Sequence, residues 1–167
     1  MADQNEILYR ESLSSRRTQG LFIALSILFG ALFIWHYIIA GFYFLSTLFL
    51  VISLFFLFYV LNYRVLHITI TQHTFSLNFG LFRWRTRIEN IESFTIDELP
   101  IFLMYGGAGV HFLIVKHRYR VSFNFLEYPR VVLRLKQARG WVKYVSFSST
   151  QPQKVFTKLA MLTANNN

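Results

Sequence analysis

The sequence contains no cysteine, which excludes disulfides, catalytic thiolates and cysteine-ligated metal sites. It also has few charges: Asp, Glu, Lys and Arg together make up 15% of the chain, a low share for a soluble domain. The absence of cysteine is compatible with a cytoplasmic protein, in which thiols stay reduced and disulfides are rare.

Charge is missing altogether from residues 21–62, where no Asp, Glu, Lys or Arg occurs. This run exceeds the roughly 20 residues that one helix needs to cross the ~30 Å hydrocarbon core, and it suits two helices joined by a tight turn. It is too long for the apolar core of a cleavable signal peptide, about 7–15 residues, so we expect it to be retained. The expected helices run from about Leu21 to Trp35 and from the turn at residues 36–41 to about Leu61.

Basic residues flank this hairpin, whereas its turn carries none. Arg10, Arg16 and Arg17 precede the first helix, and Arg64 follows the second. The positive-inside rule therefore places both termini in the cytoplasm, with the chain as a multi-pass protein of the cell inner (cytoplasmic) membrane. Because each arm is short, a hairpin that dips into one leaflet is the alternative.

The segments outside the hairpin differ sharply in charge. Residues 1–20 balance three acids against three bases, so the whole formal net charge of +9 belongs to the part after residue 62. We expect residues 1–20 to form a polar N-terminal tail or a short surface helix, and residues 164–167 to form a disordered tail.

Residues 63–163 show the period-two alternation of strands that bury one face. Leu66, Ile68 and Ile70 alternate with polar residues, and the same pattern recurs in residues 75–79 and 82–88. Further strands are expected at residues 91–96, 110–115, 119–125, 131–135 and 142–147. The sequence thus predicts seven or eight short strands.

The end of the chain changes to helical spacing. Val155, Leu159 and Leu162 would share one face of a helix that starts at about Gln151. Thr150 at the N-cap and Gln153 three residues on fit a capping box.

Several short motifs share their order and spacing with one known family: residues 68–71 (ITIT), 79–88 (FGLFRWRTRI), 91–94 (IESF), 105–110 (YGGAGV) and 145–152 (VSFSSTQP). Over about residues 65–162 the chain resembles the bacterial pleckstrin-homology-like (PH-like) domains of small membrane-tethered proteins. The resemblance implies an antiparallel barrel or sandwich closed by one C-terminal helix, behind two membrane helices. It implies a binding or assembly module and supplies no catalytic residue.

The usual signs of an active site are weak. The acids of the β domain lie near turns, as solvated carboxylates do, and its histidines lack the paired spacing of a metal site. The glycines at 106, 107 and 109 precede a strand, whereas a phosphate cradle precedes a helix. We therefore expect no catalytic residue, no metal and no cofactor, and we interpret the chain as a protein that is not an enzyme.

Basic residues are the stronger signal. Arg83, Arg85 and Arg87 alternate along one expected strand and so share one face, and Arg118 and Arg120 repeat the pattern on another. One interpretation is an ordinary solvated face of the barrel. The other is a lipid or anion-binding surface, where each base contributes about 1 kcal/mol against anionic headgroups.

A second candidate surface is the apolar loop formed by Phe102, Leu103, Met104 and Tyr105, in a chain that has 19 Phe and nine Tyr. Such a loop suits docking on a partner.

The sequence predicts a non-catalytic, membrane-anchored PH-like scaffold or assembly subunit that acts through protein–protein contacts at the cytoplasmic membrane surface. Its expected partners are membrane lipids and other membrane proteins or a second copy in a homo-oligomer, and not nucleic acid. The alternatives are an anionic lipid headgroup-binding module and an accessory subunit of a membrane enzyme or transporter.

Overall fold

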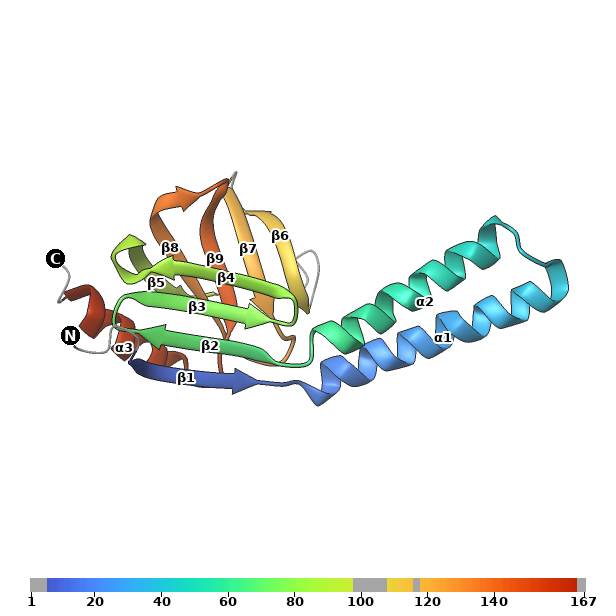
Figure 1. Cartoon of the computed structure of the whole chain (residues 1–167), viewed down its shortest axis with the longest axis horizontal. Coiled ribbons are helices and arrows are strands. Elements are labelled where there is room, and N and C mark those ends of the chain that lie inside the picture. The colour runs from blue at the N-terminus through green and yellow to red at the C-terminus, as the bar shows by residue number, and fades with distance from the viewer. Residues whose placement is uncertain (1–5, 98–107, 116–117, 165–167) are drawn as a thin grey trace. The chain divides into compact units, whose positions relative to one another are not determined.

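The computed structural model describes residues 6–97, 108–115 and 118–164, without the side chains of Val115 and Arg118 (Figure 1). The chain divides into two compact units. One is the helical hairpin, residues 15–64, and the other is a β domain built from residues 1–14 together with 65–167. The hairpin is therefore inserted into the sequence of the β domain.

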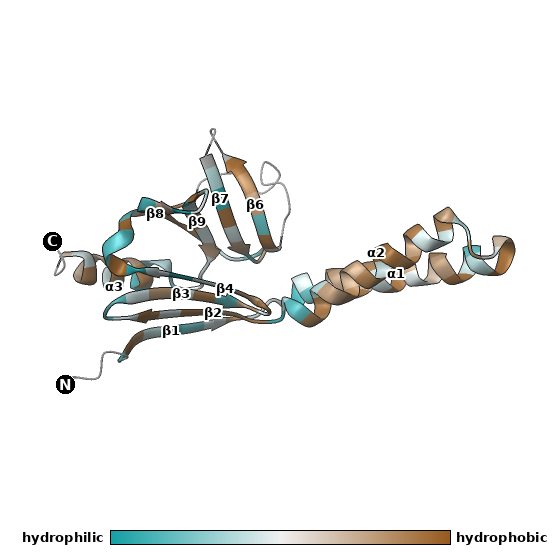
Figure 2. Cartoon of the chain, turned by 45° about the horizontal axis from the view of Figure 1, so that its top comes forward, coloured by the Kyte–Doolittle hydropathy of each residue, from teal (hydrophilic) through white to brown (hydrophobic). Residues whose placement is uncertain are grey.

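The hairpin consists of α1 (Arg16–Ala40) and α2 (Phe44–Asn62). Both helices are long and apolar enough to cross a membrane, and their largely apolar colouring is visible in Figure 2. At 1.5 Å per residue their lengths are about 37 and 28 Å, close to the ~30 Å hydrocarbon core. α1 extends further in both directions than expected, because Ser15 caps it by accepting a hydrogen bond from the Thr18 amide at 2.9 Å. Gly41, with φ of 77°, ends it.

Small polar side chains join the two helices. The Ser26 hydroxyl donates to the Ser53 carbonyl at 3.1 Å, and the Ser53 hydroxyl donates back to the Ser26 carbonyl at 2.9 Å. A Cβ on Gly30 would lie 3.3 Å from Ser53 Oγ, so the absence of a side chain there permits this close approach. Phe29 packs its ring against Phe49 and Phe56 of the facing helix. The hairpin is thus held by packing along its length.

The first sheet of the β domain has the order β1-β2-β3-β4, all antiparallel. Its strands are β1 (Ile7–Leu13), β2 (Leu66–Thr71), β3 (Thr74–Phe79) and β4 (Phe82–Arg87). The last three were expected, but β1 corrects the expectation of a polar tail or surface helix before the hairpin. Residues 7–13 are an edge strand that pairs with β2 from Ile7 opposite Thr71 to Leu13 opposite Leu66.

The second sheet has the order β5-β8-β9-β7-β6. Its strands are β5 (Ile91–Ile96), β6 (Gly109–Val115), β7 (Arg118–Asn124), β8 (Arg130–Arg139) and β9 (Val142–Ser148), and the short 3-10 helix η1 (Ile88–Asn90) links it to the first sheet. The β7–β9 pair is parallel, which corrects the expectation of an entirely antiparallel layout. The nine described strands also exceed the seven or eight expected, because β1 was not foreseen.

The two sheets lie face to face and enclose the core, as Figure 1 shows. Phe75 of β3 contacts Phe147 of β9, with ring centroids 5.2 Å apart, and Phe79 contacts Phe125, with centroids 5.0 Å apart. All four rings are fully buried. Complete burial is worth about 1.5–3 kcal/mol for a large apolar side chain, so these contacts are a main source of stability.

The C-terminal helix α3 (Pro152–Ala164) buries Val155 and Leu159 and contacts β1, β5 and η1. Its start differs from the expected capping box. Pro152 is the first helical residue, a position that suits proline. Thr150 donates both its backbone amide, at 2.7 Å, and its hydroxyl, at 2.5 Å, to the carboxylate of Glu11 on β1. The N-terminal strand therefore holds the start of the C-terminal helix.

Candidate functional site

The candidate site is the outer face of the first sheet, which carries the arginines of β4. Arg83, Arg85 and Arg87 are all exposed and alternate with Trp84 and Thr86, which point toward the core. The register places the three arginines opposite polar residues of β3: Asn78, Ser76 and Thr74. The structure thus brings these three predicted residues together on one solvent-facing surface.

The N-terminal strand adds a fourth arginine that sequence reasoning missed. Arg10 is exposed and lies opposite Thr69, Thr69 lies opposite Ser76, and Ser76 lies opposite Arg85. Directly opposed residues project from the same face of a sheet. With strands about 4.8 Å apart, Arg10 and Arg85 are separated by about 14 Å across the sheet. We call the surface formed by Arg10, Arg83, Arg85 and Arg87 and the polar residues between them the arginine face.

The polar residues of the arginine face are hydrogen-bonded to one another. The Ser12 hydroxyl and His67 Nδ1 lie 2.8 Å apart, and Arg85 Nη2 donates to Thr74 Oγ1 at 3.4 Å. The strand residues that make up this face include no acid, since Glu11 of β1 points to the opposite side and is buried. Four cations with no carboxylate among them give the face a positive potential that attracts anions.

Arg120 corrects the sequence prediction. It lies on β7 of the second sheet, where it is buried and donates to Asp97 Oδ2 at 2.9 Å. Arg130 approaches the same oxygen at 3.7 Å. Burial lowers the pKa of the Arg130 guanidinium, while the negative charge of Asp97 acts in the opposite direction. Arg120 is therefore an internal ion-pair residue. Arg118 is the first residue of the same strand, which belongs to the second sheet.

A buried polar network lies beside this ion pair. Ser146 donates to the Ser122 hydroxyl at 2.8 Å, the Asn124 amide also donates to Ser122, and all three residues are buried. Burial lowers the pKa of His111, which makes a 2.6 Å hydrogen bond with the Ala108 carbonyl. The buried hydroxyls are closed to a substrate, and the described residues contain no group of His, Asp or Glu that could hold a metal. We interpret this network as structural.

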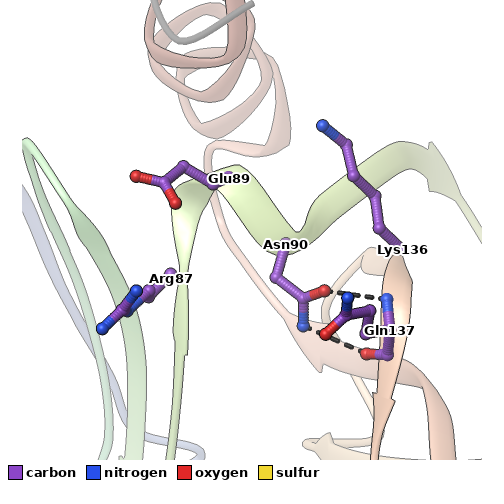
Figure 3. Close-up of a pocket in the computed structure, with 5 residues that line it drawn as sticks. All are labelled: Arg87, Glu89, Asn90, Lys136 and Gln137. Atoms are coloured by element: carbon purple, nitrogen blue, oxygen red, sulfur yellow. Dashed lines mark hydrogen bonds between the residues drawn. The ribbon is translucent and has the colours of Figure 1, made fainter.

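A polar pocket of about 370 Å³ lies where η1 meets β8, lined by Arg87, Glu89, Asn90, Lys136 and Gln137. The Asn90 amide nitrogen donates to the Gln137 carbonyl at 3.1 Å, and the Gln137 backbone amide donates to Asn90 Oδ1 at 2.8 Å. In Figure 3 Arg87 and Lys136 point away from one another. The hydrogen bonds between Asn90 and Gln137 therefore join η1 to β8, and the pocket does not focus positive charge on one point.

The predicted docking loop, Phe102, Leu103, Met104 and Tyr105, lies outside the described residues.

Comparison with family models, with curated proteins and with solved structures finds no significant match. Any functional argument thus depends on the arrangement of this chain's own residues.

Proposed function

We propose that the chain is a non-catalytic, membrane-anchored module whose arginine face binds anionic lipid headgroups. The observation that carries the proposal is the gathering of Arg10, Arg83, Arg85 and Arg87 on one solvent-facing sheet surface. In this proposal α1 and α2 cross the cytoplasmic membrane and keep the face near it. At about 1 kcal/mol per base, four arginines orient the domain against an anionic surface without having to recruit it.

The chain's connectivity supports this proposal. Two residues separate β1 from α1, and three separate α2 from β2. An extended chain spans at most about 3.6 Å per residue, so both linkers are short. Both strands belong to the sheet that carries the arginine face.

The PH-like identity is part of the same proposal. Two packed sheets and one C-terminal helix support it, together with the motif resemblance, whereas the parallel pairing of β7 with β9 departs from an all-antiparallel layout.

The test uses the full chain in nanodiscs of neutral or mixed neutral and anionic lipid. Because the chain has no cysteine, Asn78→Cys on the arginine face accepts a single environment-sensitive dye. We expect the dye spectrum to shift in anionic discs only, and the shift to fade with salt as the Debye length falls from ~10 Å at 0.1 M to ~3 Å at 1 M. The changes Arg83→Gln, Arg85→Gln and Arg87→Gln together should shift the docking equilibrium about 100-fold, or roughly 3 kcal/mol.

The matched control removes three bases elsewhere, by Arg139→Gln, Lys154→Gln and Lys158→Gln, and should keep the spectral shift. The same spectrum in neutral and anionic discs, or equal loss in both triple variants, would contradict the proposal.

Scaffolding through protein contacts is the second candidate function. It is favoured by large apolar side chains that stay exposed on the β domain, among them Leu81 and Trp141 at the tips of two-residue turns. Purification of the full chain in mild detergent, with identification of the proteins that accompany it, tests this candidate. A chain that purifies alone under several mild conditions would argue against it.

A further inference from the structure

A continuous apolar patch lies at one end of the second sheet. Phe112 and Ile114 of β6 are 73% and 69% exposed, although they share a sheet face with the buried Val121. Ile114 lies directly opposite Tyr119 of β7, and the Tyr119 ring lies 5.9 Å from the ring of Trp141, which is 81% exposed. We call Phe112, Ile114, Tyr119 and Trp141 the edge patch.

The strand that carries this patch is the outermost strand of the described second sheet. Edge strands are normally protected by charges, by proline or by irregular register. Among the other outer strands, β4 carries three arginines, while β1 and β5 each have a register shift. In contrast β6 reads Gly-Val-His-Phe-Leu-Ile-Val and pairs with β7 in regular register. Of the outer strands described, β6 alone lacks these protections.

The size and charge of the surface fit a second copy of the chain. Aromatic side chains bury about 150–250 Å² each, so the edge patch offers on the order of 500 Å². Two such patches reach about 1,000 Å² in total, the lower limit for a specific interface. β6 contains no Asp, Glu, Lys or Arg, so no like charges oppose its pairing with itself. Confinement to one membrane would raise the effective concentration of two copies further.

We propose that two copies of the chain associate edge to edge through β6, antiparallel about a two-fold axis. In such an isologous contact, with the axis at the middle of β6, Phe112 of one copy packs against Phe112 of the other and Ile114 lies opposite Val110. The backbone groups of the two strands complete each other's hydrogen bonds, and the two second sheets become one. This gives the scaffold candidate a defined partner and is independent of lipid binding by the arginine face.

The experiment uses the full chain in its membrane and exploits the absence of cysteine. Phe112 is the middle residue of β6, so Phe112→Cys places two thiols close together across the axis. We expect oxidation to give a disulfide-linked dimer at a yield at least tenfold above that of Met161→Cys, an exposed residue of α3. Adding Ile114→Lys, a charge on the seam, should reduce the yield at least tenfold, whereas adding Met161→Lys should not.

Far-UV circular dichroism of each variant checks folding, which these exposed positions should not affect. Equal yields from Phe112→Cys and Met161→Cys would overturn the proposal, as would a yield that Ile114→Lys leaves unchanged. Cross-linking of Phe112→Cys to a different protein would also overturn it, and would show that another chain occupies the edge patch.

Discussion

At the scale of single residues, Glu11 has an unusual position, because it is an acid at an inward-facing position of a strand. Its carboxylate accepts hydrogen bonds from the Tyr9 hydroxyl at 2.8 Å, the Ser149 hydroxyl at 2.7 Å and both donors of Thr150. Burial raises the pKa of Tyr9, and its hydrogen bond to Glu11 adds to the rise. Charge-assisted bonds of this kind offset the cost of burying the carboxylate.

Replacing this acid should therefore destabilise the β domain. We expect Glu11→Ala to lower the free energy of unfolding by about 2–4 kcal/mol, because buried donors lose their acceptor. Thermal unfolding of the full chain in detergent, followed by circular dichroism, measures the change. Glu6→Ala, at an exposed acid next to the same strand, should stay within about 0.5 kcal/mol. Equal effects from the two variants would mean that Glu11 does not secure α3.

Arginines and Glu11 show which features of the site the sequence alone could not predict. Alternating arginines on β4 and on β7 look alike in sequence, yet Arg85 is exposed whereas Arg120 is buried. The difference comes from Asp97, a partner on another part of the chain that alternation cannot reveal. Two partners of Glu11, Ser149 and Thr150, lie 138 and 139 residues away, so sequence alternation could not reveal its burial either.

At the scale of elements, period two identified β2 and β3 because Leu, Ile and Phe occupy their inward positions, and β4 because its arginines alternate with Trp84 and Thr86. The sequence did not predict β1, because Glu11 and the half-buried Tyr9 occupy two of its inward positions and remove the apolar alternation. For the same reason the sequence did not place Arg10, the fourth arginine of the candidate site, on the arginine face. The parallel β7–β9 pair was not predictable either, since alternation gives a strand's face and not its neighbour.

The packing of α3 can be tested directly. Leu159 is fully buried, so Leu159→Ala should reduce the free energy of unfolding by about 2–5 kcal/mol through lost contacts and a residual cavity. Met161→Ala on the exposed side of the same helix should cost less than about 0.5 kcal/mol. Chemical denaturation in detergent compares the two variants. A loss for Leu159→Ala no greater than that for Met161→Ala would show that α3 does not pack on the domain.

At the scale of the whole molecule, the pairing of β1 with β2 restricts membrane topology, because the chain on both sides of the hairpin joins one sheet. We expect reporters at the N-terminus and at the C-terminus to report the cytoplasm, in accord with Arg16, Arg17 and Arg64 beside the helices. A reporter inserted at Gly41, between α1 and α2, should report the opposite side. A cytoplasmic signal at Gly41 would indicate a hairpin that dips into one leaflet. A signal from outside the cytoplasm at the C-terminus would mean that the orientation is opposite to the one expected.

The insertion of the hairpin between β1 and β2 also sets an order of events during translation. β1 leaves the ribosome first, but its partner strand follows only after all of α1 and α2 has been made. At ~5–20 residues per second the first strand waits for seconds without a sheet to join. If the hairpin inserts with its ends on opposite sides, the bilayer separates the two strands and the sheet stays open. Under the proposed membrane insertion, closure of the sheet, and with it the seating of α3 on Glu11, therefore requires both ends of the hairpin to be on the same side of the bilayer.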